Sequence, residues 1–234
     1  MNLRKIREFS VTIVIAFIFA FGIRFFLYEP FYVPSGSMKP NLLIGDYMMV
    51  SKYSYGYGKY SFPFGKIFST REKYAKNIKR GDVAVFKPLS SPKNFYVKRV
   101  IGLPGDDIEF IDGIIFVNNI PMKQNIIGDF FDKDTKTSLI KLSEEISKDK
   151  SILILNEKHE TVQDNTINFK VPEKSYFVVG DNRDNSDDSR VNVGFVPEEN
   201  FIGRAVIILF SIDKSQGFNL FKIIRFDRLF SLID

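Results

Sequence analysis

The chain has 234 residues, 44% of them hydrophobic, with a formal net charge of +5, which excludes a disordered chain and suffices for one main core plus a smaller subdomain. No cysteine is present, so disulfides, zinc–thiolate centres and cysteine nucleophiles are excluded, while the compartment stays open. Basic residues are interleaved with 28 acidic ones along the chain, and we therefore expect a solvated surface and no nucleic-acid partner.

The first predicted element is a membrane-spanning helix. An uncharged run covers 9–23, and apolar character continues past Arg24 to Tyr28. About twenty such residues cross a hydrocarbon core of ~30 Å. Basic residues precede the run: Arg4, Lys5 and Arg7. This flank predicts a cytoplasmic N-terminus with the rest of the chain outside. A cleaved secretory signal is the alternative, since 20–22 offers a small-x-small site, but the apolar run resumes after it.

From Phe31 onward the pattern predicts short strands that are β-branched or aromatic and are separated by Gly, Pro, Asn and Asp. The predicted strands are 46–52, 82–86, 94–101, 107–111, 113–117, 175–179 and 201–210. We expect a mostly β fold whose antiparallel sheets curl toward a barrel. The expected division is a cytoplasmic N-terminus and anchor at 1–30, a β core formed by 31–117 and 171–234, and a β-rich inserted subdomain at 118–170.

Two further segments are less regular. The stretch 53–80 is rich in Tyr, Gly and Lys, and we expect a loop beside the membrane there. In the tail, 218–234, basic residues alternate with apolar ones at helical spacing. An amphipathic helix in the membrane interface and packing of the tail on the core are both open.

Ser37 is the candidate nucleophile. In Ser35-Gly36-Ser37, with Pro34 before it, the fixed φ of proline and the freedom of glycine permit a sharp bend that exposes a hydroxyl and turns N–H groups toward one point. A serine hydroxyl needs a base to take its proton. The only histidine, His159, lies far away in the polar insertion, so a Ser/His/Asp triad has no well-placed candidate.

Lys98 is the candidate base. By period two it shares a strand face with Tyr96 and Val100, so apolar groups flank it. Desolvation lowers the pKa of a lysine and makes it usable as a base; a solvated lysine at a sheet edge is the alternative. The polar cluster 180–190 fits no calcium loop, since no register supplies both the central glycine and the distal glutamate. We therefore expect an internally paired loop that orients the base, and no metal or cofactor.

With these segments in hand, the chain resembles bacterial type I signal peptidases, membrane-bound Ser/Lys endopeptidases that release secreted proteins from their leader peptides. Four blocks carry the resemblance: 34–38 (PSGSM) with Pro40 and Leu42, 80–86 (RGDVAVF), 96–106 (YVKRVIGLPGD), and 180–190 (GDNRDNSDDSR) followed by 194–197 (GFVP). The chain departs from the pattern only at variable positions, Lys39 and Asp187, and in having no tryptophan.

The resemblance implies a role for each matched residue. Ser37 becomes the nucleophile and Lys98 the general base, acting through an acyl-enzyme intermediate. The oxyanion is held by the Ser37 N–H and the Ser35 hydroxyl. Supporting residues are Ser186, which orients Lys98, Asp188 with Arg190, and Asp181 paired with Arg99. Shallow pockets that admit small side chains before the cut are lined by Phe31, Val33, Pro34, Met38, Leu42, Tyr96 and Val97.

The resemblance also implies a setting. We expect a single-pass, monomeric protein of the cytoplasmic membrane whose partners are exported preproteins and membrane lipid. The alternatives are a specialised maturation peptidase, a self-cleaving repressor with the same dyad, and a non-enzymatic anchored β-domain. The membrane segment and the lack of a DNA-binding region disfavour the repressor. The non-enzymatic alternative would require a missing catalytic residue, and none of the matched positions is missing.

Overall fold

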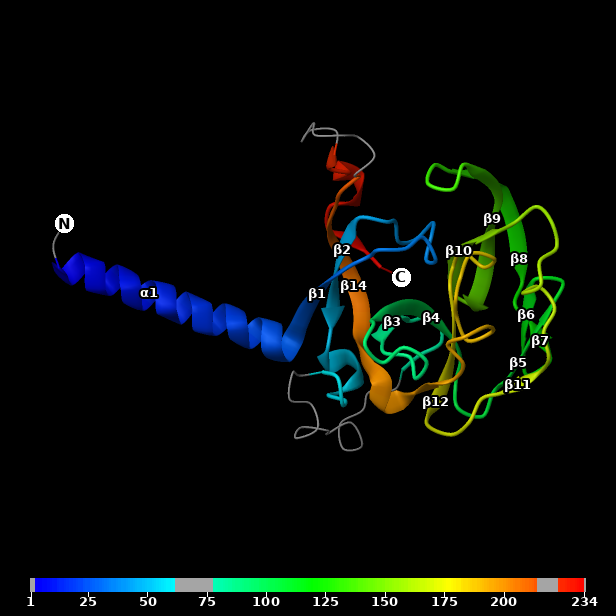
Figure 1. Cartoon of the computed structure of the whole chain (residues 1–234), viewed down its shortest axis with the longest axis horizontal. Helices are drawn as coiled ribbons and strands as arrows, with labels where there is room; N and C mark the ends of the chain where they lie inside the picture. The colour runs from blue at the N-terminus through cyan, green and yellow to red at the C-terminus, as the bar shows by residue number, and fades with distance from the viewer. Residues whose placement is uncertain (1–2, 62–77, 214–222, 234) are drawn as a thin grey trace.

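The N-terminal helix stands clear of the rest of the molecule (Figure 1). The computed structural model describes residues 3–61, 78–213 and 223–233. Helix α1 (Leu3–Gly22) continues into a π-helical turn, η1 (Ile23–Leu27), and none of the apolar stretch Arg7–Leu27 is buried against other parts of the chain. A helix that is apolar all round and lacks a protein partner is stable only in lipid. The prediction of one apolar helix of membrane-spanning length is therefore confirmed.

The sheet next to the helix has eight strands in antiparallel pairs. Its order is β1-β2-β14-β3-β4-β12-β13, with β15 paired to β14. The strands are β1 (Tyr28–Tyr32), β2 (Asp46–Ser51), β3 (Val83–Phe86), β4 (Tyr96–Gly102), β12 (Ser175–Val179), β13 (Val196–Pro197), β14 (Phe201–Ser211) and β15 (Ser231–Leu232). The curled, mostly β fold is confirmed, and β12 coincides with its predicted strand.

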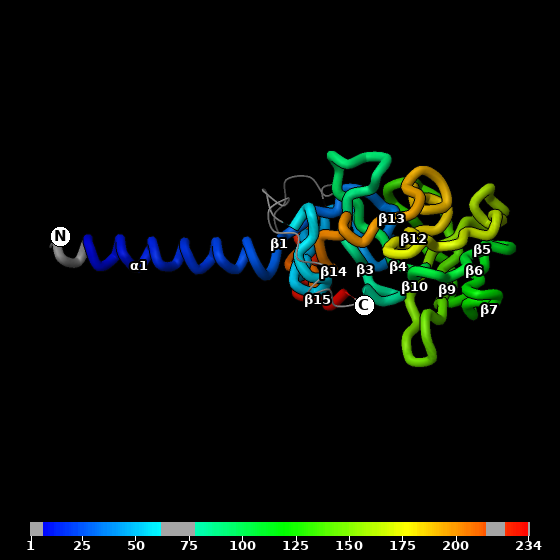
Figure 2. Tube along the Cα trace, turned by 90° about the horizontal axis from the view of Figure 1, so that it is seen from below, coloured from blue at the N-terminus to red at the C-terminus, as the bar shows by residue number. Residues whose placement is uncertain are grey.

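A second region lies at the end opposite α1 (Figure 2). One small sheet has the order β11-β5-β6-β7, from β5 (Asp107–Ile111), β6 (Ile114–Val117), β7 (Ile120–Pro121) and β11 (Phe169–Lys170). The other, which we call the insertion sheet, has the order β10-β9-β8, from β8 (Gln124–Asp132), β9 (Thr137–Ser147) and β10 (Lys150–Asn156). Because β5 and β6 pair here, the sheets separate before residue 107, earlier than the expected boundary at 118. The division into domains stays a prediction.

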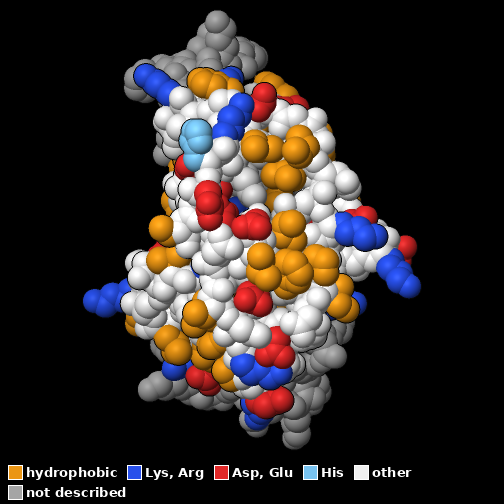
Figure 3. Space-filling model, turned by 90° about the vertical axis from the view of Figure 1, so that its right-hand side faces the viewer, with side chains coloured by type: hydrophobic (Ala, Val, Ile, Leu, Met, Phe, Trp, Pro, Cys, Tyr) orange, Lys and Arg blue, Asp and Glu red, His pale blue; other side chains and the backbone are white. Residues whose placement is uncertain are grey.

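One hydrophobic cluster spans the two regions. Phe177 and Val179 of β12 pack in the same cluster as Leu142 of β9 and Ile152 of β10. Each such side chain contributes about 1.5–3 kcal/mol when fully buried. The insertion is therefore packed onto the strand that leads to the polar loop 180–190. The end that faces away from α1 presents apolar side chains mixed with charged ones (Figure 3).

The described part of the tail is not an amphipathic helix. Residues 226–228 form a single 3-10 turn, and β15 then pairs with β14. The cause is a tertiary ion pair, in which Arg228 binds Asp46 at 2.6 Å and donates to the Asn41 carbonyl. Within 223–233, β15, Arg228 and Ile233 attach the tail to the core, whereas Phe226, Leu229 and Phe230 stay exposed. Residues 218–222 lie outside the described residues.

The segment after β2 begins by folding back on the core. Tyr55, in the short η2 turn (Tyr53–Tyr55), is 2% exposed and donates to Asp82. The Tyr57 hydroxyl donates to the Phe26 carbonyl at 2.8 Å, so this part also lies beside the end of the anchor. The expected loop at 53–80 falls largely at 62–77, outside the described residues.

Candidate active site

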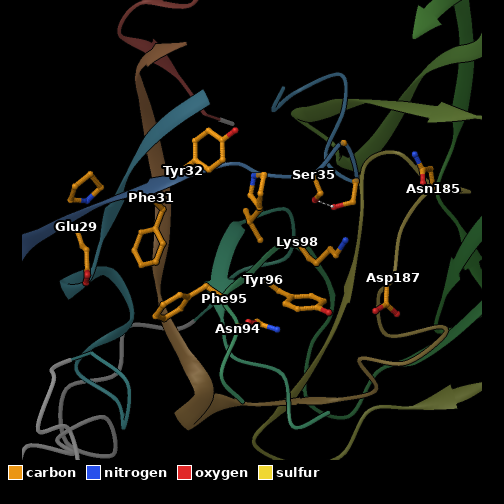
Figure 4. Close-up of a pocket in the computed structure, with 15 residues that line it drawn as sticks. Glu29, Phe31, Tyr32, Ser35, Asn94, Phe95, Tyr96, Lys98, Asn185 and Asp187 are labelled. Atoms are coloured by element: carbon orange, nitrogen blue, oxygen red, sulfur yellow. Dashed lines mark hydrogen bonds between the residues drawn. The ribbon is translucent and has the colours of Figure 1, made fainter. Parts of the chain in front are cut away.

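Ser37 lies in a turn between β1 and β2 that is anchored in the core. Val33, Met38 and Leu42 are 0% exposed, and the Ser37 side chain is itself largely buried. The Ser35 and Ser37 hydroxyl oxygens are 3.4 Å apart, as the dashed line in Figure 4 marks. Because the residues around Ser37 are buried, the turn is held in the core and is not a solvated loop.

Lys98 extends from β4 toward the turn that carries Ser35 (Figure 4). Pairing of β4 with β3 and β12 encloses the lysine, which is 3% exposed, beside the fully buried Val100. Its ammonium donates to Ser186 Oγ at 2.9 Å. Lys98 and Ser37 line the same cavity of about 780 Å³. The expected base and nucleophile therefore share one hollow.

Burial lowers the pKa of Lys98 to about 8, chiefly because the charged form loses hydration. Asp188 and Asp187 oppose this change, and Arg190 adds to it. With this pKa, about one Lys98 in eleven is neutral at pH 7. An unperturbed lysine is neutral in only about four of every ten thousand molecules. The site therefore raises the supply of neutral amine by more than two orders of magnitude.

The loop 180–190 reaches the Ser37 turn through close contacts with its backbone. Asn182 donates its N–H to the Ser37 carbonyl at 3.0 Å and its Nδ2 to the Gly36 carbonyl at 3.1 Å. At Gly180, a Cβ would lie 2.2 Å from Ser186 Oγ and 2.5 Å from the Ser37 carbonyl oxygen. Only glycine fits between these groups.

Two buried ion pairs fix this loop. Asp188 binds Arg190 at 2.8 Å and accepts from the Gly180 N–H at 3.0 Å. Burial alone would raise the pKa of the Asp188 carboxyl, but Arg190 and the Gly180 N–H hold it below its usual value. Asp181 makes two bonds of 2.8 Å to Arg99, and each residue is 1% exposed. The structure thus brings together the pairs that the sequence suggested.

The cavity contains only part of the expected substrate-binding set. Phe31, Pro34, Tyr96 and Val97 line it, as do Glu29 and Asp187. The other three expected residues, Val33, Met38 and Leu42, lie elsewhere in this structure. Their side chains belong to a core cluster with Met48, Val50 and Ile202, and they are absent from the cavity wall. They pack in the core beneath the turn that carries Ser37.

Sequence reasoning missed the residues that act through distant contacts. Asn41 Nδ2 donates to Asp181 Oδ2 and to the Leu153 carbonyl, both at 2.7 Å. Asn182 and Gly180 belong to the block 180–190 that was recognised in the sequence. Nothing in the sequence, however, predicted that they lie next to Ser37. His159 is exposed in the loop after β10 and does not line the cavity. In the described ranges no group of three His, Cys, Asp or Glu side chains could hold a metal.

Comparison with known proteins gives consistent matches. A model of the family described as "Signal peptidase, peptidase S26" matches residues 6–210. Signal peptidase I of Rickettsia typhi is 40% identical over 221 residues, which are 89% of this chain and 80% of the relative. That of Rickettsia prowazekii is 41% identical over 87% of this chain and 78% of its own. A solved signal peptidase I of Enterococcus faecalis is 28% identical, covering 55% of this chain and 97% of that one, with a TM-score of 0.33. The family match includes Ser37, Lys98 and the loop 180–190.

Proposed function

The chain belongs to the signal peptidase family, peptidase S26, and from this premise we propose how and where it works. It is a membrane-anchored serine peptidase of the signal peptidase I type that removes N-terminal signal peptides from preproteins. We assign the nucleophile to Ser37 and the general base to Lys98. One observation carries the proposal: Lys98 is buried in the cavity that also contains Ser37, and its pKa is lowered to about 8.

The reaction begins when neutral Lys98 accepts the proton of the Ser37 hydroxyl. The alkoxide attacks the carbonyl carbon of the scissile peptide, and the resulting oxyanion is held by the Ser37 N–H and the Ser35 hydroxyl. The protonated lysine then gives its proton to the leaving amine, which leaves an ester on Ser37. Lys98 next takes a proton from water, the hydroxide formed attacks the ester carbonyl, and the protonated lysine returns its proton to the Ser37 oxygen as the acid product leaves. Ser186, which accepts a hydrogen bond from Lys98, keeps the amine aimed at the serine.

Substrate selection follows from the cavity wall. Phe31, Pro34, Tyr96 and Val97 form an apolar surface near the proposed dyad, which favours uncharged side chains before the cut; that these side chains are small is what membership of the family implies. The acids Glu29 and Asp187 line the same cavity. Glu29 is 3.3 Å from Lys52, whereas Asp187 has an exposed side chain near Tyr96.

The orientation in the membrane follows from charge. Basic residues at 4, 5 and 7 stand before the apolar stretch, and the excess of basic residues marks the cytoplasmic side. We propose a single crossing of the cytoplasmic membrane with the catalytic sheets on the outer side, where exported preproteins emerge. Protease added to intact spheroplasts would then digest the catalytic part. Complete protection without permeabilisation would contradict this orientation.

The dyad is tested by cleavage of a purified preprotein in detergent micelles. Ser37→Ala and Lys98→Ala should each lower cleavage at least 10³-fold while leaving the thermal unfolding temperature near that of the wild type. Lys123→Ala, at a largely exposed lysine, is the matched control and should cleave like the wild type. Substantial residual cleavage in either dyad variant would sink the assignment.

A further inference from the structure

The insertion sheet contacts the turn between β1 and β2, which carries Ser37, at two places: Asn41 donates to the Leu153 carbonyl of β10, and the buried Lys39 reaches the end of β8. Its ammonium donates to Asp132 Oδ1 and to Asp134 Oδ2, at 2.5 Å each. Lys39 and Asp132 are 3% and 2% exposed, whereas the Asp134 side chain is 51% exposed. Asp132 is the last residue of β8 and lies 93 residues after Lys39 in the sequence. This pair is therefore a buried link between the turn and the insertion.

The Lys39 side chain folds back beneath the turn. A Cβ added to Gly36 would lie 3.0 Å from Lys39 Cε and 3.4 Å from its Nζ. The Lys39 N–H also donates to the Gly36 carbonyl at 3.1 Å. The stem of the lysine thus packs against the residue before Ser37, while Asp132 fixes the far end of the same side chain.

The insertion sheet also holds the opposite side of the site. Glu144 of β9 is 0% exposed and accepts from Arg183 Nη1 at 2.9 Å. Leu155 of β10 donates to the Asp181 carbonyl and accepts from the Arg183 N–H, both at 2.9 Å. These contacts brace the loop that carries Ser186, the partner of Lys98. The nucleophile turn and the base-orienting loop therefore rest on one sheet.

We infer that the insertion sheet is a scaffold for the active site and that Lys39 is a positioning residue whose ion pair with Asp132 holds the Ser37 turn in place. The inference rests on the proposed function of Ser37. Breaking one partner of a buried pair is destabilising, whereas removing both partners together is often tolerated. A displacement of about 1 Å at a reacting group lowers a rate by about 10²-fold. The Lys39–Asp132 pair therefore contributes to the position of the Ser37 turn rather than to the net stability of the fold.

Lys39 acts on the turn and not on the protonation of the base. The charges that shift the pKa of Lys98 are those of Asp188, Asp187, Arg190 and Asp181. Removing Lys39 should therefore lower kcat without moving the midpoint of the pH–rate profile. A general loss of folding would instead lower the amount of active enzyme and leave kcat per folded molecule unchanged.

The test compares the full-length protein in micelles with two variants, Lys39→Met and Lys39→Met/Asp132→Asn. The single variant leaves Asp132 without its main partner and should lower the unfolding temperature. The double variant should recover that temperature, yet keep kcat about 10- to 100-fold below the wild type with KM within about twofold. Amide exchange of a peptide covering 35–42 should be faster in both variants.

The matched control is Lys158→Met/Asp129→Asn, which removes an exposed 2.8 Å pair involving the same strand β8. It should match the wild type in kcat and in amide exchange. Wild-type kcat, or unchanged exchange at 35–42, in the Lys39→Met/Asp132→Asn variant would overturn the inference. Absence of Ser37-dependent cleavage in the wild type would instead overturn the proposed function, and with it the catalytic role of Lys39, while exchange would still report the link.

Discussion

Among single residues, the lowered pKa of Lys98 predicts how the cleavage rate depends on pH. Only the neutral amine can accept the Ser37 proton, and burial lowers the pKa of Lys98 to about 8. Below that pH, kcat/KM should fall about tenfold per unit, and above it the rate should level off. The measurement is kcat/KM for a neutral peptide substrate between pH 6 and about 9.5. A rate that is flat over this range would contradict the role of Lys98.

The Asp187→Asn variant tests whether Lys98 is the group whose titration sets the midpoint of the pH–rate profile. The Asp187 carboxylate raises the pKa of Lys98, against the larger lowering caused by burial. Its removal should therefore move the midpoint to lower pH and increase the rate on the acidic side. Lys158→Met serves as the control, because its side chain is on the surface and Lys158 is absent from the cavity wall. An upward movement in the Asp187 variant would exclude Lys98 as the titrating base.

Among single residues, the sequence predicted the features whose signal is local. The burial of Lys98 was predicted because a period of two places it among apolar neighbours on one strand face. Lys39 was missed because nothing nearby distinguishes it from a solvated lysine, and its partner Asp132 is 93 residues away. The burial of the Val33 side chain in the core was not predicted, because its position in the motif does not reveal which way the side chain points.

At the scale of elements, the junction between β12 and the loop 180–190 depends on one glycine. A methyl group at Gly180 would lie 2.2 Å from Ser186 Oγ and 2.5 Å from the Ser37 carbonyl oxygen. Gly180→Ala should therefore push the loop from the turn, lowering kcat by about 10²-fold and destabilising the fold by about 1–3 kcal/mol. Preprotein cleavage and thermal unfolding measure the two effects.

The control for this variant is Gly22→Ala. Nothing lies within 4 Å of a Cβ at Gly22, and alanine favours a helix more than glycine does. This change should leave cleavage unaltered. Wild-type activity in Gly180→Ala would mean that the loop and the turn can separate without loss of function, contrary to the geometry of the site.

Strand prediction succeeded where short apolar segments end in turn residues, as for β5 and β12. In the insertion the sequence predicted a β-rich subdomain but delimited none of its strands, although β8, β9 and β10 are long. The reason is exposure: most of β8 faces solvent on both sides, so its residues show little alternation. Tertiary pairing with β9, rather than local preference, makes it a strand. In the tail, helical spacing did not reveal the pairing of β15 with β14, which depends on the distant contact of Arg228 with Asp46 from β2.

At the scale of the whole molecule, the anchor and the active site lie close together along the chain. The membrane helix ends at Leu27, β1 follows at once, and the turn with Ser37 comes directly after β1. A substrate whose signal peptide is also in the bilayer is thus confined with the enzyme. Confinement raises the effective concentration of the cut site without any new contact.

This confinement predicts a dependence on shared membrane. In proteoliposomes that contain both enzyme and a preprotein with its apolar leader, kcat/KM referred to bulk volume should exceed that for a soluble peptide of the same cut sequence by at least about 10²-fold. The advantage should vanish when enzyme and preprotein are reconstituted in separate vesicles, because the distance between the bilayers then prevents encounter. In micelles, where both substrates are dispersed, the ratio should fall by an order of magnitude or more. Equal rates for separate and shared vesicles would show that the leader is recognised from solution, and the short connection from Leu27 to the Ser37 turn would then serve folding alone.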